Sequence, residues 1–111
     1  MRYRVTLETT MEPAPSEEKE ERVAVAFLER ILELLESSGG IDADAGGTFA
    51  TGEVHISTVV EAVDPDEAFS RGTALIRQAV EAAGGGVEEW SRERFILEPE
   101  EDLMPLAIAS A

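Results

Sequence analysis

Two helix-like segments, each closed by a run of glycines, divide this sequence into a fixed order of elements. The first closes at Ser37-Ser38-Gly39-Gly40 and the second at Gly84-Gly85-Gly86, and strand-like runs flank both of them. Glycine ends a helix readily because it adopts the left-handed conformation without a side-chain penalty. The order is therefore strand, helix, strand, strand, helix, strand, and it constrains the fold more than any local motif does.

Two of the strands are predicted by a two-residue period. In residues 2–8, Tyr3, Val5 and Leu7 alternate with polar side chains, which is typical of a strand buried on one side. Residues 54–62 repeat this pattern, with His55 among the polar positions. We therefore expect both segments to present one face to the core and the other to solvent.

The other two strands are less sharply defined. The second strand has two possible positions, Ile41–Ala45 or Thr48–Thr51, because glycines that suit a hairpin turn follow each of them. We expect a loose strand that covers parts of both. The last strand is predicted over Val87–Leu97, where a run of three apolar residues, Phe95 to Leu97, leaves its core-facing side undecided.

Both helices carry start signals and an apolar stripe. Ser16, after a proline-rich segment, is the predicted N-cap of the first helix, and Asp64-Pro65 predicts the start of the second. The stripe of the first helix comprises Ala24, Phe27, Leu28, Ile31 and Leu35. The stripe of the second comprises Phe69, Gly72, Ile76, Ala79 and Ala83, whose small members allow a close approach to a sheet.

This order predicts an α+β fold of the ferredoxin-like β-α-β-β-α-β plait type. Right-handed crossovers place both helices on one face of a four-stranded antiparallel sheet. We assign residues 1–98 to this single domain and residues 99–111 to a C-terminal tail that is first acidic and then apolar. The plait carries many unrelated functions, so no activity follows from it.

Composition narrows the classes of partner. The formal net charge is −15, from 24 acidic and 9 basic residues, so the surface as a whole repels nucleic acid backbones and anionic membranes. Cysteine is absent, which excludes disulfides and thiolate metal sites. No apolar run approaches the roughly 20 residues that span a bilayer. We therefore expect a cytoplasmic protein with neither a membrane nor a nucleic acid as its partner.

The sheet face without helices is the predicted interaction surface. Alternation places there a set of mostly basic side chains: Arg2, Arg4, His55, Ser57, Trp90, Arg92 and Arg94. Three interpretations remain open for this face. The first is a solvated face whose arginines pair with Glu8, Glu53, Glu61 and Glu93. The second is a surface for self-association, and the third is a site for an anion or single-stranded nucleic acid.

Catalysis and metal binding find little support in the sequence. His55 is the sole histidine and thus the one candidate for a general base near neutral pH, but no nucleophile motif accompanies it. Asp42, Asp44 and Glu53, with Gly47 between them, match the spacing of a calcium loop only in part. We predict no catalytic residue, no metal and no cofactor, and we interpret residues 42–53 as an acidic hairpin.

The C-terminal tail is the second predicted contact element. Its apolar side chains Leu103, Met104, Leu106 and Ile108 follow an acidic spacer, and we expect them to dock on the domain itself or on a neighbouring subunit.

We therefore expect a non-enzymatic binding or assembly module, either a homodimer or a subunit of a larger complex. Two alternatives stay open. One is a small enzyme or sensor that binds an anionic metabolite through His55 and the sheet arginines. The other is an acidic inhibitor that mimics nucleic acid. The expected contact residues are Arg2, Arg4, His55, Trp90, Arg92, Arg94, Leu103, Met104, Leu106 and Ile108.

Overall fold

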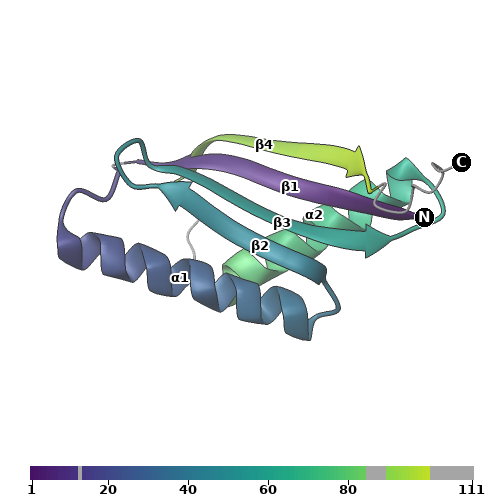
Figure 1. Cartoon of the computed structure of the whole chain (residues 1–111), viewed down its shortest axis with the longest axis horizontal. Helices are drawn as coiled ribbons and strands as arrows, with labels where there is room; N and C mark the ends of the chain where they lie inside the picture. Colours follow the sequence, from purple (N-terminus) through teal and green to yellow (C-terminus); the bar gives the residue numbers. More distant parts are fainter. Residues whose placement is uncertain (13, 85–89, 101–111) are drawn as a thin grey trace, which may run out of the picture.

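The computed structural model describes residues 1–12, 14–84 and 90–100, with residues 90–92 described by their backbone alone. The elements are β1 (Arg2–Met11), α1 (Glu18–Ser37), β2 (Ile41–Thr48), β3 (Glu53–Glu61), α2 (Pro65–Ala82) and β4 (Trp90–Pro99). The four strands form one antiparallel sheet in the order β2-β3-β1-β4 (Figure 1). The predicted α+β ferredoxin-like plait is confirmed.

Both helices pack on the same face of the sheet. Helix α1 contacts β2, helix α2 contacts β1 and β3, and the two helices also contact each other. Side chains of one face of the sheet, including Tyr3, Val5 and Leu7, form the core with residues of both helices. The opposite face carries no helix within the described residues, as Figure 1 shows.

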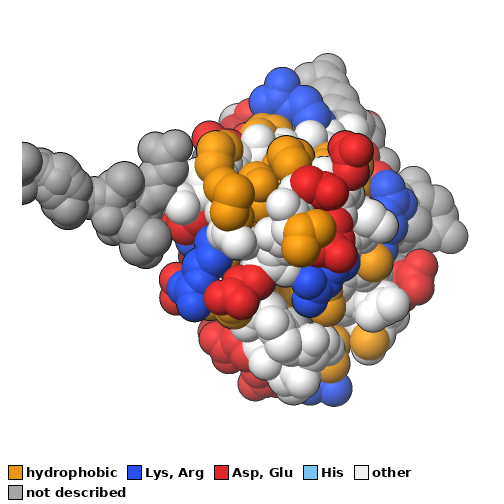
Figure 2. All heavy atoms as spheres, turned by 90° about the vertical axis from the view of Figure 1, so that its right-hand side faces the viewer, with side chains coloured by type: hydrophobic (Ala, Val, Ile, Leu, Met, Phe, Trp, Pro, Cys, Tyr) orange, Lys and Arg blue, Asp and Glu red, His pale blue; other side chains and the backbone are white. Residues whose placement is uncertain are grey.

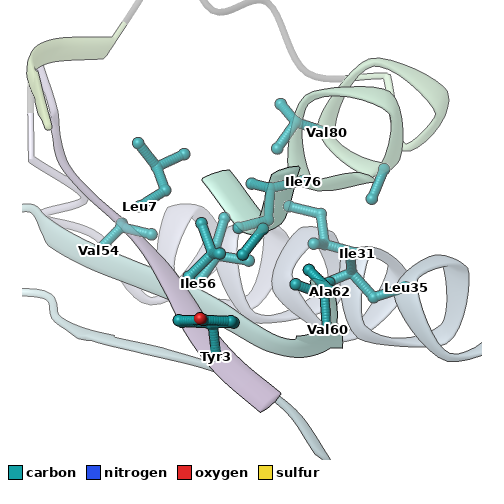
Figure 3. Packing of buried hydrophobic residues seen from close by; sticks show 13 residues of the cluster. Tyr3, Leu7, Ile31, Leu35, Val54, Ile56, Val60, Ala62, Ile76 and Val80 are labelled. Atoms are coloured by element: carbon teal, nitrogen blue, oxygen red, sulfur yellow. The ribbon is translucent and has the colours of Figure 1, made fainter. Parts of the chain in front are cut away.

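The core lies between the sheet and the helix pair (Figure 3). Of the stripe predicted for α1, Ala24, Ile31 and Leu35 are buried, while Phe27 and Leu28 pack against the core from its margin. The alternation predicted for β3 is confirmed. Its core-facing residues, together with Ala62 directly after the strand, are buried: Val54, Ile56, Thr58, Val60 and Ala62.

The prediction for the stripe of α2 was wrong at one position. Phe69 is 42% exposed, and Ala68 is buried in its place. Phe69 lies on the side of α2 that faces β4. The centroids of the Phe69 and Phe95 rings are 6.2 Å apart, and the two rings are nearly perpendicular. Because β4 is the last strand of the sheet, nothing among the described elements covers Phe69 from outside.

The second strand takes the first of its two predicted positions and extends through the glycines to Thr48. The alternative segment is the hairpin turn, in which the Thr48 carbonyl accepts hydrogen bonds from the amides of Thr51 and Gly52. Gly52 adopts a positive φ of 78°. A Cβ at this glycine would lie 2.5 Å from the Met11 carbonyl oxygen, so the turn requires glycine there.

The start of α1 also differs from the prediction. Glu17, not Ser16, is the N-cap, because the carboxylate of Glu20 turns back to accept hydrogen bonds from the amides of Ser16 at 2.9 Å and Glu17 at 3.3 Å. The start of α2 was predicted correctly, since the Asp64 side chain accepts a hydrogen bond from the Glu67 amide at 2.8 Å. Within the described residues, neither helix is both long and apolar enough to cross a membrane.

The capping carboxylate makes the stability of α1 dependent on pH. The hydrogen bond from the Ser16 amide, followed by that from Glu17, holds the pKa of Glu20 below its ordinary value of 4.5. A lowered folded-state pKa contributes stability above the unfolded pKa, and this contribution is lost as the pH falls through the folded pKa. In Glu20→Gln the unfolding free energy should therefore fall less between neutral and acid pH than in the wild-type protein, as measured by urea denaturation. Glu29→Gln, which removes the same charge from an exposed site in α1, is the control, and equal pH profiles for both variants would contradict this account.

The close approach of α2 to β1 at Gly72 predicts the effect of a substitution on stability. A Cβ on Gly72 would lie 2.6 Å from the Val5 Cβ and nearer still to its Cγ2. Gly72→Ala gains about 1 kcal/mol of helix propensity but overpacks the core at a cost of about 1–3 kcal/mol. We expect a net loss of up to about 2 kcal/mol in unfolding free energy, measured by chemical denaturation. The loss should shrink in a Val5→Ala background, and an equal loss in both backgrounds would show that the contact with Val5 is not the cause.

Candidate functional site

The sheet face opposite the helices is the candidate functional site, and we call it the open face. Across β1 and β3 its residues pair as Arg2 with Glu61, Arg4 with Val59, Thr6 with Ser57 and Glu8 with His55. On β4, Glu98, Ile96 and Arg94 continue the rows that begin at Arg4, Thr6 and Glu8. On β2, Asp44 pairs with Ser57 and Gly46 with His55. The register thus arranges side chains from all four strands in transverse rows.

One row, which we call the charged row, carries ionisable side chains on three strands: His55 on β3, Glu8 on β1 and Arg94 on β4. The His55 Nε2 lies 3.4 Å from the Asp44 Oδ2, and the Arg94 Nη2 lies 2.6 Å from the Glu8 Oε1. Glu8 stands opposite His55 in the register, so acidic and basic groups alternate from β2 to β4. The imidazole lies over Gly46, where a Cβ would come within 3.0 Å of its Cε1 atom.

A second feature is the way Arg4 covers the middle of β3. Its Nη1 donates hydrogen bonds to the Ser57 Oγ at 3.0 Å and to the Asp42 carbonyl at 3.4 Å, and its Nε pairs with Glu100 at 3.4 Å. To reach Asp42 on β2, the side chain must cross β3. Ser57 and Val59 are accordingly only 5% and 1% exposed although they lie on the open face.

A groove lies at the end of the open face near the β2–β3 hairpin. Its volume is about 540 Å³, and Glu8, Thr10, Glu53, His55 and Arg94 are among its lining residues. Both basic groups already contact carboxylates, and Glu53 adds another negative charge. A small anion would have to displace Glu8 or Asp44 to bind here, so the groove is poorly suited to an anionic ligand.

Cross-strand pairing, one of the three interpretations of this face, holds for two of its four predicted glutamates. Glu8 pairs with Arg94, and Glu61 pairs with Arg2. Glu93 pairs instead with Arg77 of α2, because it is the neighbour of Arg94 in β4 and therefore points to the helix side of the sheet. Arg4 takes Glu100 as its partner, which the sequence did not indicate.

The structure brings four of the predicted site residues together on one surface: Arg2, Arg4, His55 and Arg94. Trp90 and Arg92 belong to β4, but their side chains lie outside the described residues, and the register shift interrupts the alternation that predicted their orientation. Leu103, Met104, Leu106 and Ile108 also lie outside the described residues.

Sequence reasoning missed Thr6, Ile96 and Glu98 as residues of this face. The outward-facing series of residues 2–8 includes Thr6, but Thr6 was not among the predicted contact residues. Ile96 and Glu98 could be placed only once the pairing of β4 with β1 was known. The register between strands far apart in the sequence carries this information, and the alternation within one strand does not.

The acidic segment 42–53 forms a strand and a hairpin. Asp44 contacts His55, and Glu53 stands opposite Thr48, so these carboxylates do not converge on one point as calcium ligands must. Within the described residues no group of three or more histidine, aspartate or glutamate side chains is placed to hold a metal ion.

Comparisons with known proteins agree on the fold and give no function. No protein-family model matches the chain, and the search of curated proteins finds no significant match. Among solved structures the chain is similar to Rv0793 from Mycobacterium tuberculosis, with a TM-score of 0.52 and 15% sequence identity over 96% of both chains. At this identity the likeness shows the shared fold alone.

The covering role of Arg4 predicts that the two arginines at this end of β1 differ in their effect on stability. The Arg4 side chain is 27% exposed, whereas that of Arg2 is 47% exposed in its pair with Glu61. We expect Arg4→Ala to lower the unfolding free energy by about 1–2 kcal/mol and Arg2→Ala to change it by less than about 0.5 kcal/mol. Arg4→Met, which keeps the apolar stem over β3, should recover part of the loss. Equal losses from Arg2→Ala and Arg4→Ala in urea denaturation would refute this role.

Proposed function

We propose that this protein is a non-enzymatic binding or assembly module that acts through its open face and its C-terminal tail, as a homodimer or as a subunit of a larger complex. The observation that carries the proposal is the composition of the open face. Across β4, β1 and β3 its middle row consists of uncharged groups, Ile96, Thr6 and Ser57, with Asp44 of β2 at one end, and charged residues lie on both sides of it. Protein interfaces commonly have such a centre, poor in charge, within a polar rim.

The charge balance of the open face supports self-association in particular. The chain as a whole carries a net charge of −15, so two copies repel each other over most of their surface. On the open face several carboxylates are paired with basic groups, such as Glu8 with Arg94 and Glu61 with Arg2. Copies approaching through this face therefore meet less repulsion than copies approaching through the helices.

The place of Glu100, the last described residue, supports a joint action of the tail and the open face. The amide of Glu100 donates a hydrogen bond to the Arg2 carbonyl, and its carboxylate pairs with Arg4. The chain therefore continues from one end of the open face. Exposed apolar side chains, Met1 at 77% and Val63 at 80%, lie at the same end of the sheet. Figure 2 views this end, where hydrophobic side chains lie among acidic and basic ones.

The two alternative functions draw less support from the structure. A sensor for an anionic metabolite would need the basic groups of the groove to be available, and both His55 and Arg94 are engaged by carboxylates. An inhibitor that mimics nucleic acid would need a regular array of acidic groups, whereas acids and bases alternate along the charged row of the open face. Assembly remains the function that these contacts favour.

Light scattering after size exclusion tests the proposal. We expect the wild-type chain to exceed the monomer mass at micromolar concentration, and both Thr6→Glu and deletion of Leu103–Ala111 to weaken association by about tenfold, because each removes a part of the contact surface. Gln78→Glu adds the same charge to an exposed site on α2 and should have no effect. The assembly role is ruled out if the wild-type chain and the deletion variant are both strict monomers and the wild-type chain also binds no partner protein.

A further inference from the structure

Within the described residues, the outer edge of β4 presents backbone groups that bond to no other strand. The Glu100 amide bonds to the Arg2 carbonyl, and Glu98, Ile96 and Arg94 occupy the equivalent positions opposite β1. In an antiparallel pair the residues that bond to a given neighbour alternate along the strand. The amides and carbonyls of Phe95 and Leu97 therefore point away from β1, toward the outer edge.

The two edges of the sheet differ in how they are protected. On β2, the other outer strand, Asp42 adopts a positive φ of 48° and the register shifts between Ile41 and Asp44. Such a bulge, together with acidic side chains, hinders the addition of a further strand. On β4 the pairing is regular from Arg94 to Pro99, and its centre is the apolar run Phe95 to Leu97.

The sequence of this edge is complementary to itself. Arg94-Phe95-Ile96-Leu97-Glu98 reads, from either end toward Ile96, as a charge, a large apolar residue and the central isoleucine, with opposite charges at the two ends. A strand of this kind can pair with an antiparallel copy of itself so that every residue meets a suitable partner.

We propose that β4 pairs with β4 of a second copy around a two-fold axis at Ile96. Phe95 and the partner's Leu97 exchange backbone hydrogen bonds, as do Leu97 and the partner's Phe95. Arg94 stands opposite the partner's Glu98 on the open face, and the two copies of Ile96 meet at the axis. This inference rests on the proposed function, because it names a second copy as the partner and adds the edge of β4 to the open face as a contact.

The two neighbouring registers of this strand pair each lose a charge pair or a backbone hydrogen bond. If Phe95 stood opposite the partner's Phe95, Arg94 would face the partner's Ile96 and lose its charge partner. If Leu97 stood opposite the partner's Leu97, Phe95 would face Pro99, which has no amide hydrogen to donate. The register centred on Ile96 pairs Arg94 with Glu98 and leaves Phe95 and Leu97 with all their backbone hydrogen bonds.

The pairing also accounts for two features that the single chain leaves unexplained. Ile96 is an apolar residue in the middle row of the open face, and the pairing places it against its own copy. Within the described part of the chain, the Glu98 carboxylate makes no ion pair or hydrogen bond, since Arg4 opposite it pairs with Glu100. A two-fold axis perpendicular to the sheet keeps both open faces on the same side, so that they form one continuous surface.

A charge-swap experiment tests the register. We expect Arg94→Glu and Glu98→Arg each to raise the dissociation constant of the dimer by about tenfold or more, because like charges then meet at two symmetry-related places. The double variant Arg94→Glu/Glu98→Arg should restore association to within about threefold of the wild-type value, as measured by sedimentation equilibrium. Within one chain these two residues are four positions apart and do not contact each other, so loss of folding or of intrachain pairs predicts no such rescue. If the effects of the two substitutions on the free energy of dissociation simply add in the double variant, the inference is wrong.

Cross-linking provides an independent test, since the chain has no cysteine of its own. At the axis the two copies of residue 96 form a pair without mutual hydrogen bonds, with Cα atoms about 4.5 Å apart, which a disulfide can span. Ile96→Cys should therefore give a covalent dimer under mild oxidation. Arg94→Cys should not, because its two copies lie about 13 Å apart along the paired strands, whereas a mixture of Arg94→Cys and Glu98→Cys chains should cross-link.

The outcomes separate the failure of this inference from the failure of the proposed function. A chain that associates and responds to Thr6→Glu, but shows neither charge rescue nor the Ile96→Cys dimer, assembles through the open face alone, and the edge pairing is then wrong. A chain that is monomeric and binds no partner protein contradicts both.

Discussion

The close packing of α2 on the central strand β1 is the contact on which the rest of the structure depends. Gly72 brings the helix so near to Val5 that no side chain fits between them. The helix can then bury Ile76, Ala79 and Val80 against the sheet. With α1 on the same side, this packing leaves the opposite face and the outer edge of β4 free of helices within the described residues.

The open face also differs in its electrostatics from the rest of the protein surface. A chain with a net charge of −15 disfavours contact between copies at most orientations. The open face brings Arg2, Arg4, His55 and Arg94 next to carboxylates from other strands. Antiparallel pairing thus gathers basic residues that are distant in sequence on one surface, and these local ion pairs are the basis of the proposed assembly through it.

Much of the fold could be predicted because its signals are local. The alternation of Tyr3, Val5 and Leu7 determines one face of β1, and Asp64-Pro65 determines the start of α2. The start of α1 was misplaced because Glu20 bonds to the amides before the helix, a competition between neighbouring caps that residue type alone does not resolve. Phe69 was misplaced because its exposure depends on which strand lies at the edge of the sheet.

The candidate site was only partly predictable, for a related reason. Alternation placed Arg4 and His55 on the open face, but it did not show that Arg4 would cross β3 and bury Val59. It also did not show that the register of β4 on β1 shifts between Glu8 and Thr10, which interrupts the alternation beyond Arg94. These features depend on pairing between strands about 40 to 90 residues apart in the sequence, and no local pattern records that pairing.

The central claim is that the protein assembles through the surface that its helices leave uncovered. Amide hydrogen exchange, followed residue by residue at low and high protein concentration, tests it most directly. The account predicts that the amides of Phe95 and Leu97 exchange rapidly in the dilute protein and become protected as concentration rises, while those of Ile96 and Glu98, which bond to β1, are protected throughout. Rapid exchange at Phe95 and Leu97 at every concentration, with no change in protection elsewhere on the sheet, would contradict it.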